Sequence, residues 1–259
     1  MKSTKQWMKR EINERGYTNI FMHGNEKSLK VGEQTHPILS VAQRLTNVQS
    51  QIEMAVRERS SYYDGKNVTL VAVSKRQTDD KIEAALIAGQ RVFGENRVQE
   101  AKLKFENIKI KNNNIKLHLT GPLQSNKVKQ ALSLFDVFHT LDREKLLREL
   151  AKFPEIIIKK SFFIQINTGK EITKSGVFPE DAKSFLDLCK KKGLKNIDGL
   201  MCIPPINESP SKHFQIIIDL TKNLGLGRPS IGMSADYLEA LDFDPQYIRL
   251  GTILFGKRQ

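Results

Sequence analysis

The stretch that decides the fold is VTLVAVSK, residues 68–75, a run of mostly β-branched apolar side chains that ends in Ser74 and Lys75. An unbroken run of this kind is typical of a strand that is buried on both faces, as in a parallel sheet covered by helices. Residues 81–88 follow with a helical pattern, and Gly89 is placed to end that helix. A strand followed by a helix is the repeating unit of α/β folds.

The same alternation continues along the chain. We expect further strands at 91–93, 115–119, 137–140, 161–166, 197–202, 229–231 and 247–250. We expect helices at 37–59, 98–108, 127–134, 143–152, 180–192, 212–223 and 235–241. Eight strands separated by helices predict an α/β fold, a single-domain (β/α)8 barrel of the TIM type. A doubly wound open sheet is the alternative, but no G-x-G-x-x-G turn follows the first strand.

The chain divides into two parts of different character. Residues 1–36 are polar, contain three glycines and lack apolar periodicity, so we expect a weakly ordered N-terminal extension. Residues 37–259 carry the whole barrel pattern and are expected to form one domain. Because the chain ends at Gln259 soon after the last strand, we expect no second domain behind the barrel.

The net charge of +13 raises the question of nucleic acid. The positive charges are spread along the chain, with residues 190–192 as the densest run, and no zinc finger or aromatic-rich RNA-binding motif appears. We therefore expect a solvated, lysine-rich surface and no specific nucleic-acid partner.

Membrane and metal binding are not expected either. No apolar run reaches about 18 residues, so no transmembrane helix and no membrane partner are predicted. No apolar stretch follows the basic start, as a secretion signal would require. The two cysteines, Cys189 and Cys202, lie in no CxxC pair and at no metal-ligand spacing to a histidine. We expect two buried, reduced thiols in a cytoplasmic protein without a metal.

In such a barrel the chemistry sits at the carboxyl ends of the strands. Lys75 follows the first strand there, and it is either a solvated surface lysine or a Schiff-base lysine whose ammonium form a buried mouth would disfavour. Asn96 follows the second strand, as a helix cap or a ligand contact. His118 lies within the third strand, where a satisfied core histidine is the plainer interpretation.

The last two expected strands are followed by residues that suit a phosphate. They offer hydroxyls and unhindered backbone N–H groups, although ordinary helix capping would use the same residue types. These residues are Ser230, Gly232, Ser234, Gly251 and Thr252. Together with Lys75 they predict a phosphorylated ligand beside a lysine.

Six segments carry a resemblance to a known family. They are VAVSK, FGENRVQE, HLTGPLQSNK, GLMCIP, SIGMSAD and IRLGTILFGKR, in this order within residues 37–259. The chain resembles the pyridoxal phosphate (PLP) homeostasis protein family, whose fold is similar to the barrel domain of alanine racemase. The resemblance implies that Lys75 forms a Schiff base with PLP and that Ser230, Ser234, Gly251 and Thr252 hold the phosphate. It also implies that Arg249 faces the pyridine nitrogen and that Asn96 and His118 lie near the cofactor.

The resemblance implies a PLP-binding protein for intracellular vitamin B6 homeostasis and supply, without established catalytic turnover and therefore without catalytic residues. Arg249 supports this, because an arginine stays protonated and disfavours a protonated pyridine nitrogen, which weakens the ring as an electron sink. The alternative is a PLP-dependent amino-acid racemase, and a residual racemase-type activity stays open. Beyond PLP itself, PLP-dependent apo-enzymes are the partners that the resemblance raises, and we expect a monomer or a weak dimer.

Overall fold

The computed structural model describes residues 37–59 and 68–256. The expected N-terminal extension at 1–36 lies outside the described residues, as do residues 60–67 and 257–259. None of the helices within the described ranges is both long and apolar enough to cross a membrane. Both cysteines are buried and free of disulfide bonds.

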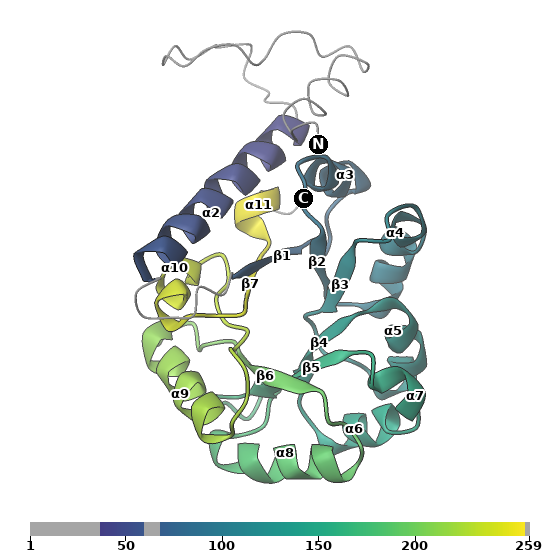
Figure 1. Ribbon diagram of the computed structural model, residues 1–259, viewed down its shortest axis with the longest axis vertical. Helices are drawn as coiled ribbons and strands as arrows, with labels where there is room; N and C mark the ends of the chain where they lie inside the picture. Colours follow the sequence, from purple (N-terminus) through teal and green to yellow (C-terminus); the bar gives the residue numbers. More distant parts are fainter. Residues whose placement is uncertain (1–36, 60–67, 257–259) are drawn as a thin grey trace.

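The centre of the fold is one parallel sheet of seven strands in the order β6-β5-β4-β3-β2-β1-β7. Its strands are β1 (Thr69–Val73), β2 (Val92–Glu95), β3 (Lys116–Leu119), β4 (Val137–Leu141), β5 (Ser161–Ile166), β6 (Ile197–Cys202) and β7 (Tyr247–Leu250). All pairings are parallel, so every strand presents its carboxyl end at the same side. The strands lie inside a ring of helices (Figure 1).

The prediction of an eighth strand at 229–231 is wrong. The segment makes only isolated parallel bridges, through Ser230 to Met201 in β6 and to Tyr247 in β7. Pro229 has no N–H for a ladder, and Gly232 turns the chain away with a φ of 88°. Because β6 and β7 are the two edges of the sheet, Ser230 nevertheless joins them and closes the barrel.

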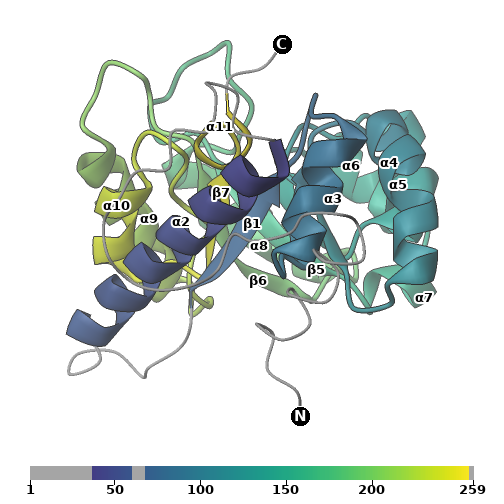
Figure 2. The ribbon, with the colours of Figure 1, turned by 90° about the horizontal axis from the view of Figure 1, so that it is seen from above.

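Helices cover the outside of the barrel, as the alternating pattern predicts (Figures 1 and 2). They are α2 (Pro37–Arg59), α3 (Asp79–Ile87), α4 (Val98–Lys111), α5 (Val128–Leu134), α6 (Glu144–Leu150), α7 (Pro154–Ile157), α8 (Ala182–Lys191), α9 (Pro210–Asn223), α10 (Tyr237–Ala240) and α11 (Thr252–Phe255). Short 3-10 turns are η1 (Ser125–Lys127), η2 (Pro179–Asp181) and η3 (Leu241–Phe243). The confirmed fold is a single-domain TIM-type α/β barrel.

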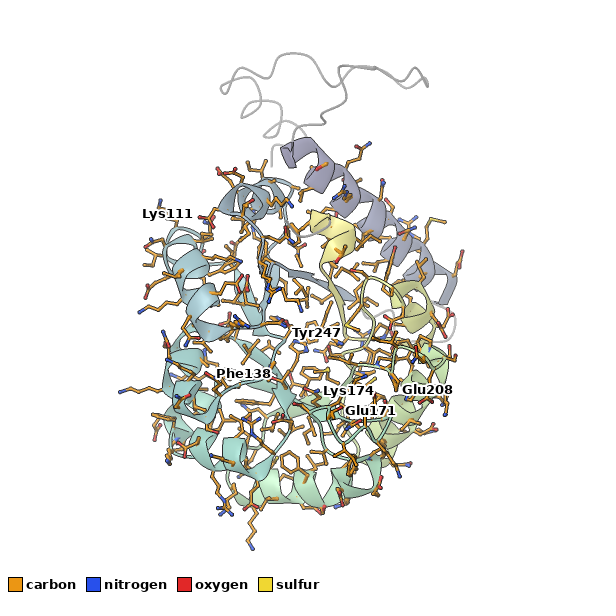
Figure 3. All side chains as sticks on the ribbon, turned by 180° about the vertical axis from the view of Figure 1, so that it is seen from behind. Lys111, Phe138, Glu171, Lys174, Glu208 and Tyr247 are labelled. Carbon is orange, nitrogen blue, oxygen red and sulfur yellow. The ribbon has the colours of Figure 1, made fainter. Side chains whose placement is uncertain are left out.

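Alternation along the strands divides the buried side chains into two layers. The larger layer packs between the sheet and the helices and includes Phe93 and Leu117. A small second cluster of Val137, Phe163 and Met201, with Tyr247 packed against it, is separate from that layer. Figure 3 shows Tyr247 near the middle of the ring of elements. The barrel interior is therefore filled with side chains at its base, which leaves the carboxyl ends of the strands for binding.

Candidate functional site

Strand register places Lys75 on the inward face of the barrel. Val73, Gly94 and His118 are successive register partners across β1, β2 and β3, so their side-chain positions share one face. This face is the inside of the barrel, because the His118 ring lies 4.9 Å, centroid to centroid, from Tyr247, which packs against the interior cluster. Alternation then directs Ser74 outward and Lys75 inward. Lys75 is half-buried at the end of β1.

The guanidinium of Arg249 is a buried positive charge inside the barrel. It donates to Ser230 Oγ at 2.7 Å through Nη1 and to the backbone oxygen of Cys202 at 3.0 Å through Nη2. Only 5% of Arg249 is exposed. Burial lowers the pKa of Arg249, and the nearby Asp236 opposes that shift. Both acceptors are neutral, so the guanidinium retains donors and positive charge for a further electron-rich group.

A chain of two histidines leads from Ser230 deeper into the barrel. His139 Nδ1 lies 2.9 Å from Ser230 Oγ, and His139 Nε2 lies 2.9 Å from His118 Nδ1. Burial lowers the pKa of His118 to about 3 and the pKa of His139 well below its usual range, where His118 and Arg249 depress it further. Both rings are therefore neutral at neutral pH. The two histidines therefore fix the Ser230 hydroxyl, which in turn accepts a hydrogen bond from Arg249.

The segments expected to bind phosphate meet beside β1. Ser234 Oγ accepts hydrogen bonds from the backbone N–H groups of Gly251 at 3.3 Å and Ile253 at 3.5 Å. A Cβ at Gly251 would lie 3.2 Å from the Val73 oxygen, so this backbone approaches the strand that carries Lys75. Thr252 begins α11 with an exposed side chain. The hydroxyl of Ser234 and these backbone amides form a polar lining at the mouth.

Gly232 is buried, and a Cβ there would lie 2.7 Å from Ala240 Cβ, so only glycine fits. Asn96 is half-buried at the end of β2, and its Oδ1 accepts a hydrogen bond from Thr120 Oγ1 at 3.0 Å. Asn96 therefore lies on the inward side next to the strand of Lys75.

The predicted site residues occupy two levels. Lys75, Asn96, Ser234, Gly251 and Thr252 come at the ends of strands or just beyond them. His118, Ser230 and Arg249 lie below, joined through His139.

Sequence reasoning missed His139 and the Cys202 carbonyl. A signal for His139 existed, since it is a polar residue at an inward position of an apolar strand, as His118 is. The Cys202 carbonyl carries no such signal, because any residue would supply it. Among the described residues, no cluster of three histidine, cysteine or acidic side chains could hold a metal ion.

The barrel fold and the residues at the carboxyl ends of its strands match a known protein family. Residues 48–259 match the family described as "Alanine racemase, N-terminal domain". Relatives named "Pyridoxal phosphate homeostasis protein" include that of Aquifex aeolicus, 34% identical over 85% of this chain and 100% of its own length. That of Schizosaccharomyces pombe is 35% identical over 83% of this chain and 94% of its own. The chain belongs to the pyridoxal phosphate homeostasis protein family.

Solved structures agree with this assignment. PipY of Synechococcus elongatus, solved with PLP bound, is 30% identical and superposes with a TM-score of 0.69 over 83% of this chain and all of its own. The alanine racemase of Acinetobacter baumannii is 14% identical, with a TM-score of 0.65 over 85% of this chain and 61% of its own, and it shares the fold.

Proposed function

We propose that this chain is a PLP-binding protein that carries PLP as a Schiff base on Lys75 and takes part in intracellular PLP homeostasis and supply. The observation that carries the proposal is the buried Arg249, held in the barrel interior by Ser230 and the Cys202 carbonyl beneath an inward-facing lysine. The relatives named for PLP homeostasis and the PLP-bound PipY support it.

The residues fit the shape and chemistry of PLP. Val71 is the register partner of Arg249, and Lys75 lies two residues beyond the end of β1 at Val73, so Lys75 is nearer the carboxyl end of the barrel than Arg249. A pyridine ring bound in the barrel would be held between the Lys75 amine and the Arg249 guanidinium. Ser234 Oγ accepts from the backbone N–H groups of Gly251 and Ile253, which leaves its own proton to donate to a phosphate beside β1. Asn96 lines the neighbouring strand end.

Each side chain has one task in this arrangement. PLP supplies an aldehyde that condenses with an amine with loss of water, and a ring that withdraws electrons. Lys75 supplies that amine from a half-buried position just beyond the end of β1. Arg249 donates to the pyridine nitrogen and, being cationic, opposes its protonation. Ser230 and the two histidines hold Arg249 in place.

The same arrangement favours carriage over turnover. Within the described residues no carboxylate forms an ion pair with Arg249, and Asp236 acts on it only from a longer distance, so the guanidinium keeps its positive charge beside the ring. A pyridine ring that stays unprotonated is a weak electron sink, so the bound cofactor activates an attached amino acid only weakly. We propose a cytoplasmic carrier that releases PLP to PLP-dependent apo-enzymes. The shared fold of alanine racemase keeps an amino-acid racemase as the second candidate.

Two measurements on purified protein test the proposal. The parent should show the absorbance band of a PLP Schiff base, and Lys75→Ala should lose it, whereas Lys102→Ala, on the exposed face of α4, should keep it. Chiral analysis of several amino acids incubated with the PLP-loaded protein should show no racemisation. Turnover at ordinary enzyme rates, about 1–1000 per second, would establish the racemase instead.

A further inference from the structure

A cluster of charged side chains lies behind Lys75, on the helix side of the sheet. Glu95 ends β2 directly after the inward-facing Gly94, so it points outward toward α4, and it is fully buried. Its Oε1 accepts a hydrogen bond from Ser74 Oγ at 2.7 Å and lies 3.3 Å from Lys104 Nζ. Its other oxygen, Oε2, has no hydrogen-bond partner. A buried carboxylate destabilises the fold unless charged and hydrogen-bonding partners compensate for its lost hydration.

Lys104 connects this carboxylate to the backbone of β1. It reaches in from α4 with 11% of its side chain exposed. Its Nζ donates to the Ser74 backbone oxygen at 2.9 Å and to Glu100 Oε1 at 2.7 Å. One ammonium group therefore contacts two carboxylates and the carbonyl of the residue before Lys75.

Glu100 fixes the residue on the other side of Lys75. Its Oε1 accepts a hydrogen bond from the Arg76 backbone N–H. Arg76 has a φ of 57°, a left-handed conformation that costs a non-glycine residue about 1 kcal/mol or more. Since Glu100 holds that N–H, the side chains of α4 compensate for the strain. Lys75 is thus the centre of a three-residue turn whose two neighbours are both bound by α4.

The cluster does not reach into the barrel. Ser74 and Glu95 face outward by alternation, whereas Lys75 faces inward. Any effect on a ligand in the barrel must therefore pass through the backbone of residues 74–76.

We propose that Glu95, Lys104 and Glu100 are positioning residues that hold the turn of residues 74–76 so that the Lys75 amine is aimed at the aldehyde carbon of PLP. The inference rests on the proposed role of Lys75. Without the cluster the turn relaxes, and the amine approaches the aldehyde in many orientations. Misplacement of a reacting group by about 1 Å costs up to about 100-fold in rate.

Two substitutions separate positioning from general damage. Lys104→Met keeps the length of the side chain and removes all three contacts. Glu100→Ala removes the acceptor for Arg76 N–H from a half-buried position, where little core packing is lost. Lys102→Met is the matched control, because Lys102 is on the same helix in an exposed pair with Glu106 at 3.7 Å. If Lys104→Met leaves buried Glu95 uncompensated and does not fold, the double variant Glu95→Gln/Lys104→Met removes both charges together.

Three readouts are measured on each variant. The first is the rate at which PLP becomes attached to the protein. The second is the affinity for pyridoxine 5′-phosphate, which has the ring and phosphate but no aldehyde. The third, on PLP-free protein, is the rate of reductive methylation of Lys75 by formaldehyde across a pH series, followed by peptide mass spectrometry.

We expect PLP attachment to slow about tenfold or more in Lys104→Met, or in the double variant, and to slow measurably in Glu100→Ala. Affinity for pyridoxine phosphate should stay within about twofold of the parent, because the phosphate and ring contacts do not involve the cluster. The pH profile of Lys75 methylation should change, and Lys102→Met should match the parent in all three readouts.

Two results would overturn the inference. One is an attachment rate that matches the parent in the folded variants. The other is an equal fall in attachment rate and pyridoxine phosphate affinity, which indicates general disruption of the mouth. Attachment of PLP in the parent to a lysine other than Lys75 would instead refute the proposed function.

Discussion

Ser230 Oγ accepts a hydrogen bond from Arg249 Nη1 at 2.7 Å, and the same residue forms the backbone bridges that close the barrel. Ser230 therefore both closes the sheet and positions the buried guanidinium of Arg249. The residue that replaces the missing eighth strand sets the position of the cation at the base of the site. These contacts predict that Ser230 acts on a ligand through Arg249, in place of the direct phosphate contact expected from the sequence, whereas Ser234 is placed to act directly.

This difference predicts different results for two serines. Ser234→Ala should weaken PLP binding by about 1–3 kcal/mol and leave pyridoxal, which lacks the phosphate, nearly unaffected. Ser230→Ala should weaken the binding of both forms to a similar extent, because Arg249 then keeps only its hydrogen bond to the Cys202 carbonyl. Titration of each variant with PLP and with pyridoxal measures how much more tightly it binds the phosphorylated form. If the parent binds the two vitamers equally, the phosphate assignment is wrong.

Arg249→Glu should make the cofactor more reactive. A carboxyl group near the pyridine nitrogen favours its protonation, and a protonated ring withdraws electrons more strongly from an attached amino acid. We expect faster exchange of the amino acid α-hydrogen with deuterium from solvent than in the parent, measured by NMR. PLP occupancy must be determined first, since the Cys202 carbonyl that accepts from Arg249 cannot donate to the new carboxyl group. Faster exchange in the parent than in a fully loaded variant would contradict the role given to Arg249.

The buried histidines predict acid sensitivity. Burial lowers the pKa of His118 from 6.5 to about 3, so the unfolded chain binds a proton that the folded chain refuses. The contribution of neutral His118 to the free energy of unfolding is fully present above pH 6.5. It is lost as the pH falls from there toward 3, with a limiting slope of about 1.4 kcal/mol per pH unit. The free energy of unfolding, measured with denaturant between pH 6 and 5, should depend less steeply on pH in His118→Gln than in the parent. An unchanged slope would mean that His118 is protonated in the folded protein.

The N-terminal segment gives a prediction from sequence alone. Because residues 1–36 lack apolar periodicity, a chain that starts at Pro37 should keep the PLP absorbance spectrum and nearly the same melting temperature. Thermal denaturation of PLP-loaded protein measures both. A large loss of folded protein on truncation would show that the segment contributes to the fold.

Much of the barrel could be predicted from the chain. The strands 161–166, 197–202 and 247–250 and the helix 37–59 match the structure residue for residue, because each is a short apolar run or a long periodic one. Helices α7 and α11 were not predicted, since four residues are too few to show a period. The segment at 229–231 resembles a strand because Ser230 and Ile231 are buried, but it forms β-bridges only at Ser230 and so does not extend into a ladder.

The sequence named residues at both levels of the site, but the contacts among the deeper ones could not be predicted. Strand-end residues such as Lys75 and Ser234 can be found from sequence, because parallel strands end at one side. The contacts of Arg249, His139 and Ser230 join residues up to 91 positions apart, from His139 to Ser230, through three-dimensional register that no local pattern encodes. The roles of Glu95 and Lys104 were missed for the same reason.

The most direct test of the account is the identity of the lysine that holds PLP. The PLP-loaded protein is reduced with borohydride, digested, and the modified peptide is sequenced by mass spectrometry. The account predicts that the pyridoxyl group is found on Lys75, in the segment VAVSK, at close to one equivalent per chain. A major adduct on another lysine, or no reducible adduct at all, would contradict it.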